Sequence, residues 1–383
     1  MLFAGILSMT VCLGLMYPCV LASRRLGLVD VPNGRKRHQE PTSLVGGLVI
    51  FLAISITNTI FPVASWSFLG WLALVLFIGL LDDIYDVSYK IRLVFHAVVV
   101  VGIATTDGLI VNNIGAVFGG STIDFFGPIA IVFTAIGVIG AINVVNMTDG
   151  VDGLLGSLML VSLLALFVFG YDAQSEVAVS VASIFVLMGA LLAFLTVNGR
   201  FLGLKRALVF MGDAGSTVLG FYFVYLLIAY SQGDLAVISP VLAGWILGLP
   251  LLDGSAVIAS RVLDRKAPFY PDRRHLHHLL MDGGLSVNQT VGTMLALHSI
   301  LVGAASVAYV VFGSKVEPVL FWGFVALVAV RVFCEPILSA LNSGNGEQER
   351  ERSVALEAGL LDSSSSEKIS LSRKGRKEHS SRV

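Results

Sequence analysis

Residues 128–146 read PIAIVFTAIGVIGAINVVN, and this stretch decides the fold class of the chain. It is apolar without interruption, it carries no charged side chain, and its polar residues gather at its last turn. A helix needs roughly 20 such residues to cross about 30 Å of hydrocarbon. A barrel strand would instead alternate between apolar and polar residues. The stretch therefore predicts a transmembrane helix that delivers polar groups to one membrane surface.

The composition of the whole chain agrees with that prediction. Of 383 residues, 56% are apolar and 13% are charged, whereas soluble domains carry about 25% charged residues. The mean hydropathy is +0.85. The net charge of −1 gives no indication of a nucleic-acid partner. We expect an all-α polytopic membrane protein.

Similar apolar runs predict eleven transmembrane helices. Their expected limits are 2–22, 44–63, 66–81, 92–107, 128–146, 154–171, 177–197, 216–231, 235–258, 289–312 and 316–338. Residues 1–341 would form one integral membrane domain. Residues 342–383 contain few large apolar side chains and predict a disordered cytoplasmic tail.

The basic residues predict the orientation of these spans. Segments 23–43, 82–92, 198–215 and 259–288 hold fifteen Lys and Arg residues, whereas the segments on the opposite side hold only Lys315. Basic loops stay in the cytoplasm. The N-terminus is therefore expected outside the membrane, as an uncleaved first span. The basic tail is expected in the cytoplasm, which also requires an odd number of spans.

Acidic residues gather at the cytoplasmic ends of the predicted spans. Carboxylates are costly near a bilayer, so several at one face indicate a functional site. Asp82 and Asp83 are adjacent, and Asp86 follows Asp82 by one helical turn. Mg²⁺ binds one or two carboxylates together with substrate phosphates, and Lys90 could contact the same phosphates. A solvated loop is the alternative for this segment.

The strongest motif follows the stretch quoted above. Asn143, Asn146, Asp149 and Asp152 recur at every third position, with glycines beside the last two. This spacing places polar groups above one another at the end of a helix. Their side chains can recognise the hydrogen-bonding groups of a base or a sugar. An ordinary helix cap would need a single Asn or Gly, so we interpret the motif as a binding site.

A third acidic motif reads FMGDAGS at residues 210–216. Small residues surround Asp213 where a span begins, which suits a metal-bound phosphate. The alternative is an ordinary helix start with Asp213 or Ser216 as the N-cap.

The longest basic loop carries the motif DRRHLHHL at residues 272–279. Arg273, His275, His277 and His278 could bind a diphosphate. Zinc is the less favoured alternative, because the loop has no cysteine and two of the histidines are adjacent. A second basic cluster, at residues 35–38, would attract phosphate or merely set the orientation.

Two further features remain open at this point. Asp253 lies within a predicted span, where it could line the site or form a structural hydrogen bond, and Pro250 before it could kink that helix. Residues 108–127 could form a short hairpin or a re-entrant segment on the outer side.

Together these motifs resemble the polyprenyl-phosphate N-acetylhexosamine-1-phosphate transferases, from about Asp30 to about Leu280. The interrupted histidine motif and the basic cluster at residues 35–38 are similar to the WecA-like branch of that family. The MraY branch has three consecutive histidines and a P-T-M-G-G motif, and this chain has neither.

The resemblance implies roles for individual residues. Asp213 resembles the Mg²⁺ ligand, and Asp82 and Asp83 resemble the catalytic pair near the lipid phosphate. Asn146, Asp149 and Asp152 are similar to nucleotide-sugar-binding positions. Lys90 and the histidine motif resemble diphosphate and sugar contacts.

The resemblance also implies the reaction. The chain would transfer N-acetylglucosamine-1-phosphate from UDP-GlcNAc to undecaprenyl phosphate, with Mg²⁺ as cofactor and Mn²⁺ as a substitute. It would act at the cytoplasmic face of a bacterial inner membrane, in a pathway of the O-antigen type. Another UDP-N-acetylhexosamine donor is one alternative. A secondary transporter and a non-catalytic membrane scaffold are the others, and the sequence leaves a monomer and a homo-oligomer both open.

Overall fold

The computed structural model describes residues 1–31, 40–171, 181–234, 236–268 and 273–335. The basic cluster at residues 35–38 and the expected tail at 342–383 lie outside this range. The described helices are α1 Leu2–Leu26, α2 Gly46–Ile60, α3 Trp66–Tyr85, α4 Tyr89–Thr106, α5 Pro128–Thr148, α6 Leu154–Gly170, α7 Val181–Asn198, α8 Gly212–Ser231, α9 Pro240–Leu263, α10 Leu276–Asp282 and α11 Val287–Phe312. Two 3₁₀ turns, η1 Arg200–Leu202 and η2 Gly313–Val316, complete the set, and residues 317–335 form one more helix after η2, here called the terminal helix.

Each of the eleven predicted spans coincides with a long helix of the structure. Eight stretches are long and apolar enough to cross a membrane, and the last of them, Val287–Glu335, contains both α11 and the terminal helix. Two shorter apolar helices, α2 and α6, correspond to the other predicted spans. The chain is therefore a multi-pass, mostly helical membrane protein.

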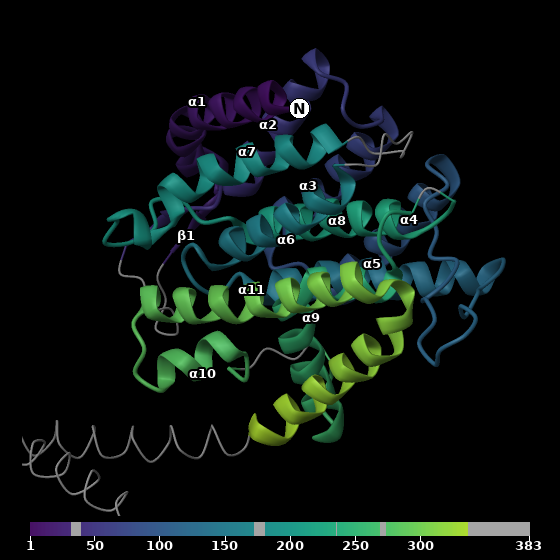
Figure 1. Cartoon of the computed structure of the whole chain (residues 1–383). Coiled ribbons are helices and arrows are strands. Elements are labelled where there is room, and N and C mark those ends of the chain that lie inside the picture. The colour runs from purple at the N-terminus through teal and green to yellow at the C-terminus, as the bar shows by residue number, and fades with distance from the viewer. Residues whose placement is uncertain (32–39, 172–180, 235, 269–272, 336–383) are drawn as a thin grey trace, which may run out of the picture.

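Helix α8 lies at the centre of the bundle (Figure 1). All of its residues from Ala214 to Ser231 are buried. A helix that is apolar on every side belongs in the interior, and α2, α3, α5 and α9 pack around this one. By contrast, α1 exposes large apolar side chains along its outer face, including Phe3 and Tyr17. This arrangement suits a protein in which α1 contacts lipid and α8 is held in place inside the bundle.

Helix α9 is broken in the turn before Pro250, where the sequence suggested a kink. The non-helical residue is Gly248, with φ 56° and ψ −121°. The N–H of Leu249 donates to Nδ1 of His298 on α11, at 3.2 Å. His298 Nε2 lies 2.9 Å from the hydroxyl of Ser162, which in turn donates to the carbonyl of Ile246. Because Nδ1 accepts a hydrogen bond, the proton of His298 is on Nε2.

The break has a simple cause. Pro250 lacks an N–H and clashes with the carbonyl four residues earlier, that of Ile246. The Ser162 hydroxyl satisfies this freed carbonyl, and His298 satisfies the N–H of Leu249. A side chain at Gly248 would lie 2.7 Å from His298 Nδ1, so glycine is needed there. His298 is thus a structural residue.

The connection at residues 108–127 forms a hairpin, which is one of the two structures expected for it. Asn113 and Asp124 form an antiparallel bridge, and Ile114 and Ile123 are joined by a backbone hydrogen bond of 3.2 Å. The buried carboxylate of Glu317 accepts the N–H of Ala116 at 2.7 Å. The hairpin is therefore fixed to the start of the terminal helix.

A small sheet lies at the opposite end of the bundle, beside the polar motifs. Strands β1 Val29–Asp30 and β2 Thr42–Ser43 pair antiparallel. Ser43 also forms a parallel bridge with Val209. The sheet joins the segment between α1 and α2 to the start of α8. It also brings Asp30 to the site described next.

Candidate functional site

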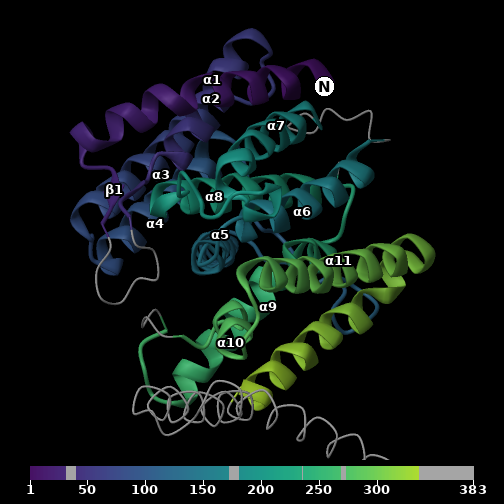
Figure 2. The ribbon, with the colours of Figure 1, turned by 90° about the vertical axis from the view of Figure 1, so that its left-hand side faces the viewer.

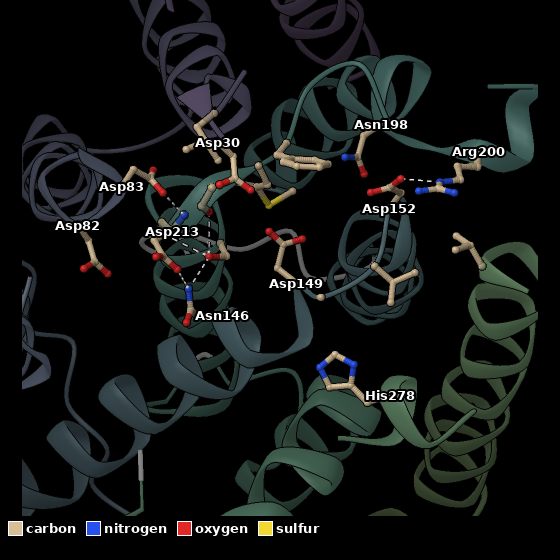
Figure 3. A pocket seen from close by; sticks show the side chains of 18 of the residues that line it. Asp30, Asp82, Asp83, Asn146, Asp149, Asp152, Asn198, Arg200, Asp213 and His278 are labelled. Carbon is tan, nitrogen blue, oxygen red and sulfur yellow. Dashed lines mark hydrogen bonds and ion pairs between the residues drawn. The ribbon is translucent and has the colours of Figure 1, made fainter. Parts of the chain in front are cut away.

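One pocket of about 710 Å³ opens at the end of the bundle where α3, α5 and α7 end and α6 and α8 begin. This volume is typical of a site for a medium-sized ligand. Figure 2 turns that end of the bundle toward the viewer, and Figure 3 shows the lining side chains. The predicted site residues that line the pocket are Asp82, Asp83, Asn146, Asp149, Asp152, Asp213, Arg273 and His278.

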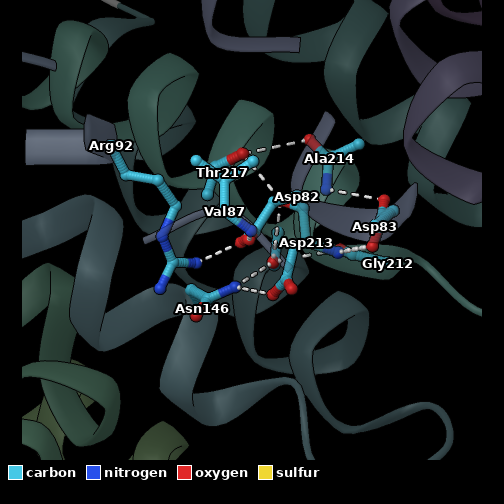
Figure 4. A network of polar contacts seen from close by, with 10 residues as sticks. Asp82, Asp83, Val87, Arg92, Asn146, Gly212, Asp213, Ala214 and Thr217 are labelled. Carbon is cyan, nitrogen blue, oxygen red and sulfur yellow. Dashed lines mark hydrogen bonds and ion pairs between the residues drawn. The ribbon is translucent and has the colours of Figure 1, made fainter. Parts of the chain in front are cut away.

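The two adjacent aspartates of α3 point in different directions (Figure 4). Asp82 forms an ion pair with Arg92 of α4 and accepts the N–H of Val87 at 2.8 Å. Asp83 instead accepts the backbone N–H groups of Asp213 and Ala214, at 2.7 and 3.1 Å. Only one of the pair therefore faces a cation.

Asp83 acts as an N-cap for α8 from a different helix. The N-terminus of a helix has unsatisfied N–H groups and a partial positive charge, and Met211 provides no side-chain cap. Gly212 has φ +74°, and a Cβ there would lie 2.7 Å from Oδ2 of Asp83. The glycine in this motif lets the carboxylate approach. The alternative reading of this motif, in which Asp213 or Ser216 is the N-cap of α8, is wrong.

Asp213 faces the pocket and meets Asn146 from α5. The side-chain amide of Asn146 donates to Oδ1 of Asp213 at 2.6 Å and to the hydroxyl of Ser216 at 2.8 Å. Its amide oxygen stays available. Two polar motifs that lie 67 residues apart in the chain are thus joined directly at the pocket.

Asp149 comes directly after α5, at the centre of the carboxylate group. Burial of its carboxyl group, and then the negative charge of Asp213, raise the pKa of Asp149 to about 7. Asp152 and Asp83 contribute in the same direction. Carboxylates that crowd in this way repel one another unless a cation joins them.

Asp152, unlike Asp149, contacts a positively charged side chain within the described part of the chain. Its Oδ2 accepts Nε of Arg200 at 2.5 Å and the N–H of Ala207 at 3.2 Å. Asn198 accepts the N–H of Gly153 at 2.6 Å and donates to the carbonyl of Val209 at 2.8 Å. These contacts fix the loop after α7 against the loop after α5. The two loops together form one wall of the pocket, and the end of α3 forms the wall opposite (Figure 3).

The histidine motif divides between the pocket and the interior. His278 lines the pocket. His277 is buried, and a Cβ at Gly150 would lie 2.3 Å from its Nε2. Burial lowers the pKa of His277 to about 3, so this residue is neutral at pH 7. His275 lies away from the pocket and pairs with Asp253, with Nδ1 2.9 Å from Oδ2.

Two other predicted residues also lie outside the main pocket. Lys90 is exposed on the first turn of α4. Asn143 donates to the carbonyl of Ile139 and lines a separate, much smaller cavity of about 10 Å³ with His96. The three-residue spacing therefore brings Asn146 to the pocket but turns Asn143 aside.

Sequence reasoning missed three polar residues of the pocket: Asp30, Asn198 and Arg200. Asn198 ends α7 and Arg200 lies two residues further on, much as Asp83 lies in the last turn of α3 and Asp149 directly follows α5. The sequence could have indicated both residues, because they lie at the end of a predicted span on the same side as the acidic motifs. Nothing in the sequence indicated Asp30, because only the pairing of β1 with β2 brings it there.

Within the described residues, no group of three or more His, Cys, Asp or Glu side chains is arranged to hold a metal ion. The pocket nevertheless offers acidic oxygen donors in Asp83, Asp149 and Asp213. Mg²⁺ is usually bound by one or two carboxylates, with water and substrate phosphates as its other ligands. Such a site needs no protein cage of three ligands, so the donor set is suitable.

Comparisons with known proteins now identify the family. A model of glycosyl transferase family 4 matches residues 65–231. A protein of Escherichia coli (strain K12) is 38% identical over 272 residues, which cover 70% of this chain and 72% of the relative. A relative in Yersinia pestis is 38% identical over 309 residues, or 79% and 81% of the two chains. Both are named undecaprenyl-phosphate alpha-N-acetylglucosaminyl 1-phosphate transferase.

The match includes α3, α5 and α8, whose ends carry the acidic motifs, so the motifs and the overall similarity agree. This chain is a membrane-embedded transferase that belongs to glycosyl transferase family 4.

Proposed function

We propose that this protein transfers N-acetylglucosamine-1-phosphate from UDP-GlcNAc to undecaprenyl phosphate. The products would be UMP and undecaprenyl-diphospho-N-acetylglucosamine. The observation that carries the proposal is the pocket in which Asp83, Asn146, Asp149 and Asp213 meet at one end of the bundle. The names of the relatives support both the donor sugar and the lipid acceptor.

We place the catalytic site at the inner surface of a bacterial inner membrane, in a chain with eleven spans. The pocket lies at the end of the bundle that carries Arg92, Arg200 and Arg273. Basic loops favour the cytoplasm, where a nucleotide sugar is available. We assign the product to an envelope polysaccharide pathway of the O-antigen type.

The divalent cation would bind at Asp213, with Asp149 and the donor diphosphate close by. Asn146 donates to Oδ1 of Asp213 and so holds this carboxylate at the pocket. Bound Mg²⁺, or Mn²⁺ in its place, would neutralise the charge that develops on the departing UMP. This placement accounts for three carboxylates with no cation of the described chain against them.

The chain's own residues would mainly orient the two substrates. Phosphoryl transfer depends on positioning and on charge stabilisation. An oxygen of the acceptor phosphate would form a bond with the β-phosphorus, while the bond from that phosphorus to the UMP oxygen breaks. The second pKa of a phosphate monoester is about 6, so the acceptor is mostly ionised at neutral pH and needs no strong base.

The two walls of the pocket suggest where each substrate lies. Asp82 and Arg92 are at the α3–α4 side, beside lipid-exposed helices, which suits the acceptor phosphate. Arg200, Arg273 and His278 are at the opposite side and provide donors for a nucleotide diphosphate. Asp83 keeps the start of α8 in place.

An assay of the purified protein in lipid nanodiscs tests the proposal. Undecaprenyl phosphate and Mg²⁺ are supplied with UDP-GlcNAc, UDP-GalNAc or UDP-MurNAc-pentapeptide, and both UMP and the lipid product are measured by mass spectrometry. We expect UDP-GlcNAc to react fastest. A faster reaction with another donor would change the substrate assignment, and absence of UMP with every donor would contradict the proposed reaction.

A further inference from the structure

The terminal helix carries an arginine inside its apolar sequence. Arg331 is 9% exposed and contacts Asp253 of α9, which is 4% exposed. Its Nε and Nη2 lie 3.2 and 3.1 Å from Oδ1 of Asp253. Charges within membrane spans are costly and usually mark a function, yet neither residue lines the pocket.

The Asp253–Arg331 pair also holds three consecutive residues where α10 begins, Arg274, His275 and Leu276. Asp253 contacts Nδ1 of His275 and accepts the N–H of Leu276, at 2.9 and 3.1 Å. Arg331 donates through Nη2 to the carbonyl of Arg274. The hydrogen-bonding capacity of the pair is thus directed at the backbone and at one histidine.

The three fixed residues lie between two side chains of the pocket. Arg273 precedes them and His278 follows them, and both line the cavity. Helix α10 has only seven residues, too few to be stable alone in water. Its position must therefore come from outside contacts.

We propose that the buried Asp253–Arg331 pair anchors α10 and thereby positions Arg273 and His278 against the donor. His275 is then a positioning residue rather than a substrate ligand. The anchor connects the last membrane helix to the catalytic loop, so the terminal helix contributes to donor binding without touching the donor. The inference rests on the proposed assignment of the pocket to UDP-GlcNAc.

A variant series separates positioning from general stability. Arg331→Gln breaks the anchor, and Arg331→Lys restores the charge. The double variant Asp253→Asn with Arg331→Gln removes both charges, which avoids the cost of one unpaired buried charge. Glu317→Gln is the matched control, because Glu317 is a buried charge on the same helix that accepts a hydrogen bond from Ala116 of the hairpin, away from α10.

Two measurements decide the question. Amide hydrogen exchange of residues 276–282 reports the position of α10 without any turnover. Steady-state kinetics report the KM for UDP-GlcNAc separately from the KM for undecaprenyl phosphate. A displacement of about 1 Å in a binding group can cost about 100-fold in rate.

We expect faster exchange in α10 and a fall of about 100-fold in kcat/KM for the donor, in both Arg331→Gln and the double variant. The acceptor KM should be unchanged, Arg331→Lys should recover most of the loss, and Glu317→Gln should match the wild type in α10. Unchanged exchange in α10 would overturn the proposal, and so would equal loosening in the control. If the wild type does not use UDP-GlcNAc, the proposed function fails while the exchange data still test the anchor.

Discussion

Carboxylates occupy two neighbouring regions of this protein, half-buried in one and buried in the other, and have opposite surroundings in them. At the junction of α3, α5 and α8, no Lys, Arg or His of the described chain forms an ion pair with Asp83, Asp149 or Asp213. Around α10, by contrast, Asp253 contacts both His275 and Arg331. Asp253 is thus neutralised by side chains of the chain itself, whereas we propose that Asp149 and Asp213 are neutralised by a ligand that brings positive charge.

The largest expected effect tests the acidic region directly. Asp213→Asn should reduce transfer by about 100-fold to 1000-fold, because several kcal/mol of charge stabilisation would be lost. The hydrogen bond from Asn146 can be kept by the new amide oxygen, so the fold should remain. UMP release and the thermal melting curve are measured together. Full activity would remove Asp213 from the mechanism.

The second prediction compares two arginines of one loop. Arg200→Ala removes the partner of Asp152 at the pocket, and loss of a charged hydrogen bond should raise the donor KM about tenfold. Arg206→Ala is the control, because Arg206 pairs with exposed Glu40 away from the pocket. Equal donor KM values in the two variants would contradict the assignment of this wall to the nucleotide.

The third prediction concerns the cap that Asp83 provides for α8. Asp83→Ala leaves the N–H groups of Asp213 and Ala214 without their acceptor and should lower the free energy of unfolding by about 1–2 kcal/mol. Asp83→Asn keeps one acceptor oxygen and should lose less. Thermal unfolding in detergent checks both. If the alanine variant is as stable as the wild type, the carboxylate is not a cap.

The smallest effect is a change in the pH dependence of stability. The pKa of Asp149 is about 7 in the folded chain, against about 3.9 for an ordinary Asp side chain. Between these values the unfolded chain releases a proton that the folded chain keeps, so stability falls as pH rises from about 4 to about 7. Asp149→Asn should flatten this part of the curve of Tm against pH in the ligand-free protein. An unchanged slope would show that the carboxyl group is not crowded.

Much of this arrangement could be predicted from the sequence. Apolar runs alone located the long helices, because a helix that lies in a membrane must be apolar over most of its length. The ends of α3, α5 and α8 share one membrane surface, so Asp83, Asn146 and Asp213 were expected to meet. The structure does bring them together.

What remained unpredictable depends on contacts between distant segments. The role of His275 is set by Asp253 and Arg331, which are 22 and 56 positions away. Asn143 turns aside because the last turns of α5 present its two asparagines to different neighbours. Sequence spacing gives the position of a residue on its own helix, but not the helix that faces it.

Binding of UDP to the purified protein tests the central claim most directly. Isothermal titration with and without Mg²⁺, in the wild type and in Asp213→Asn, measures whether acidic residues and cation act together on the diphosphate. We predict tight binding only when both Mg²⁺ and Asp213 are present. Equal affinity without the metal, or in the variant, would contradict the account.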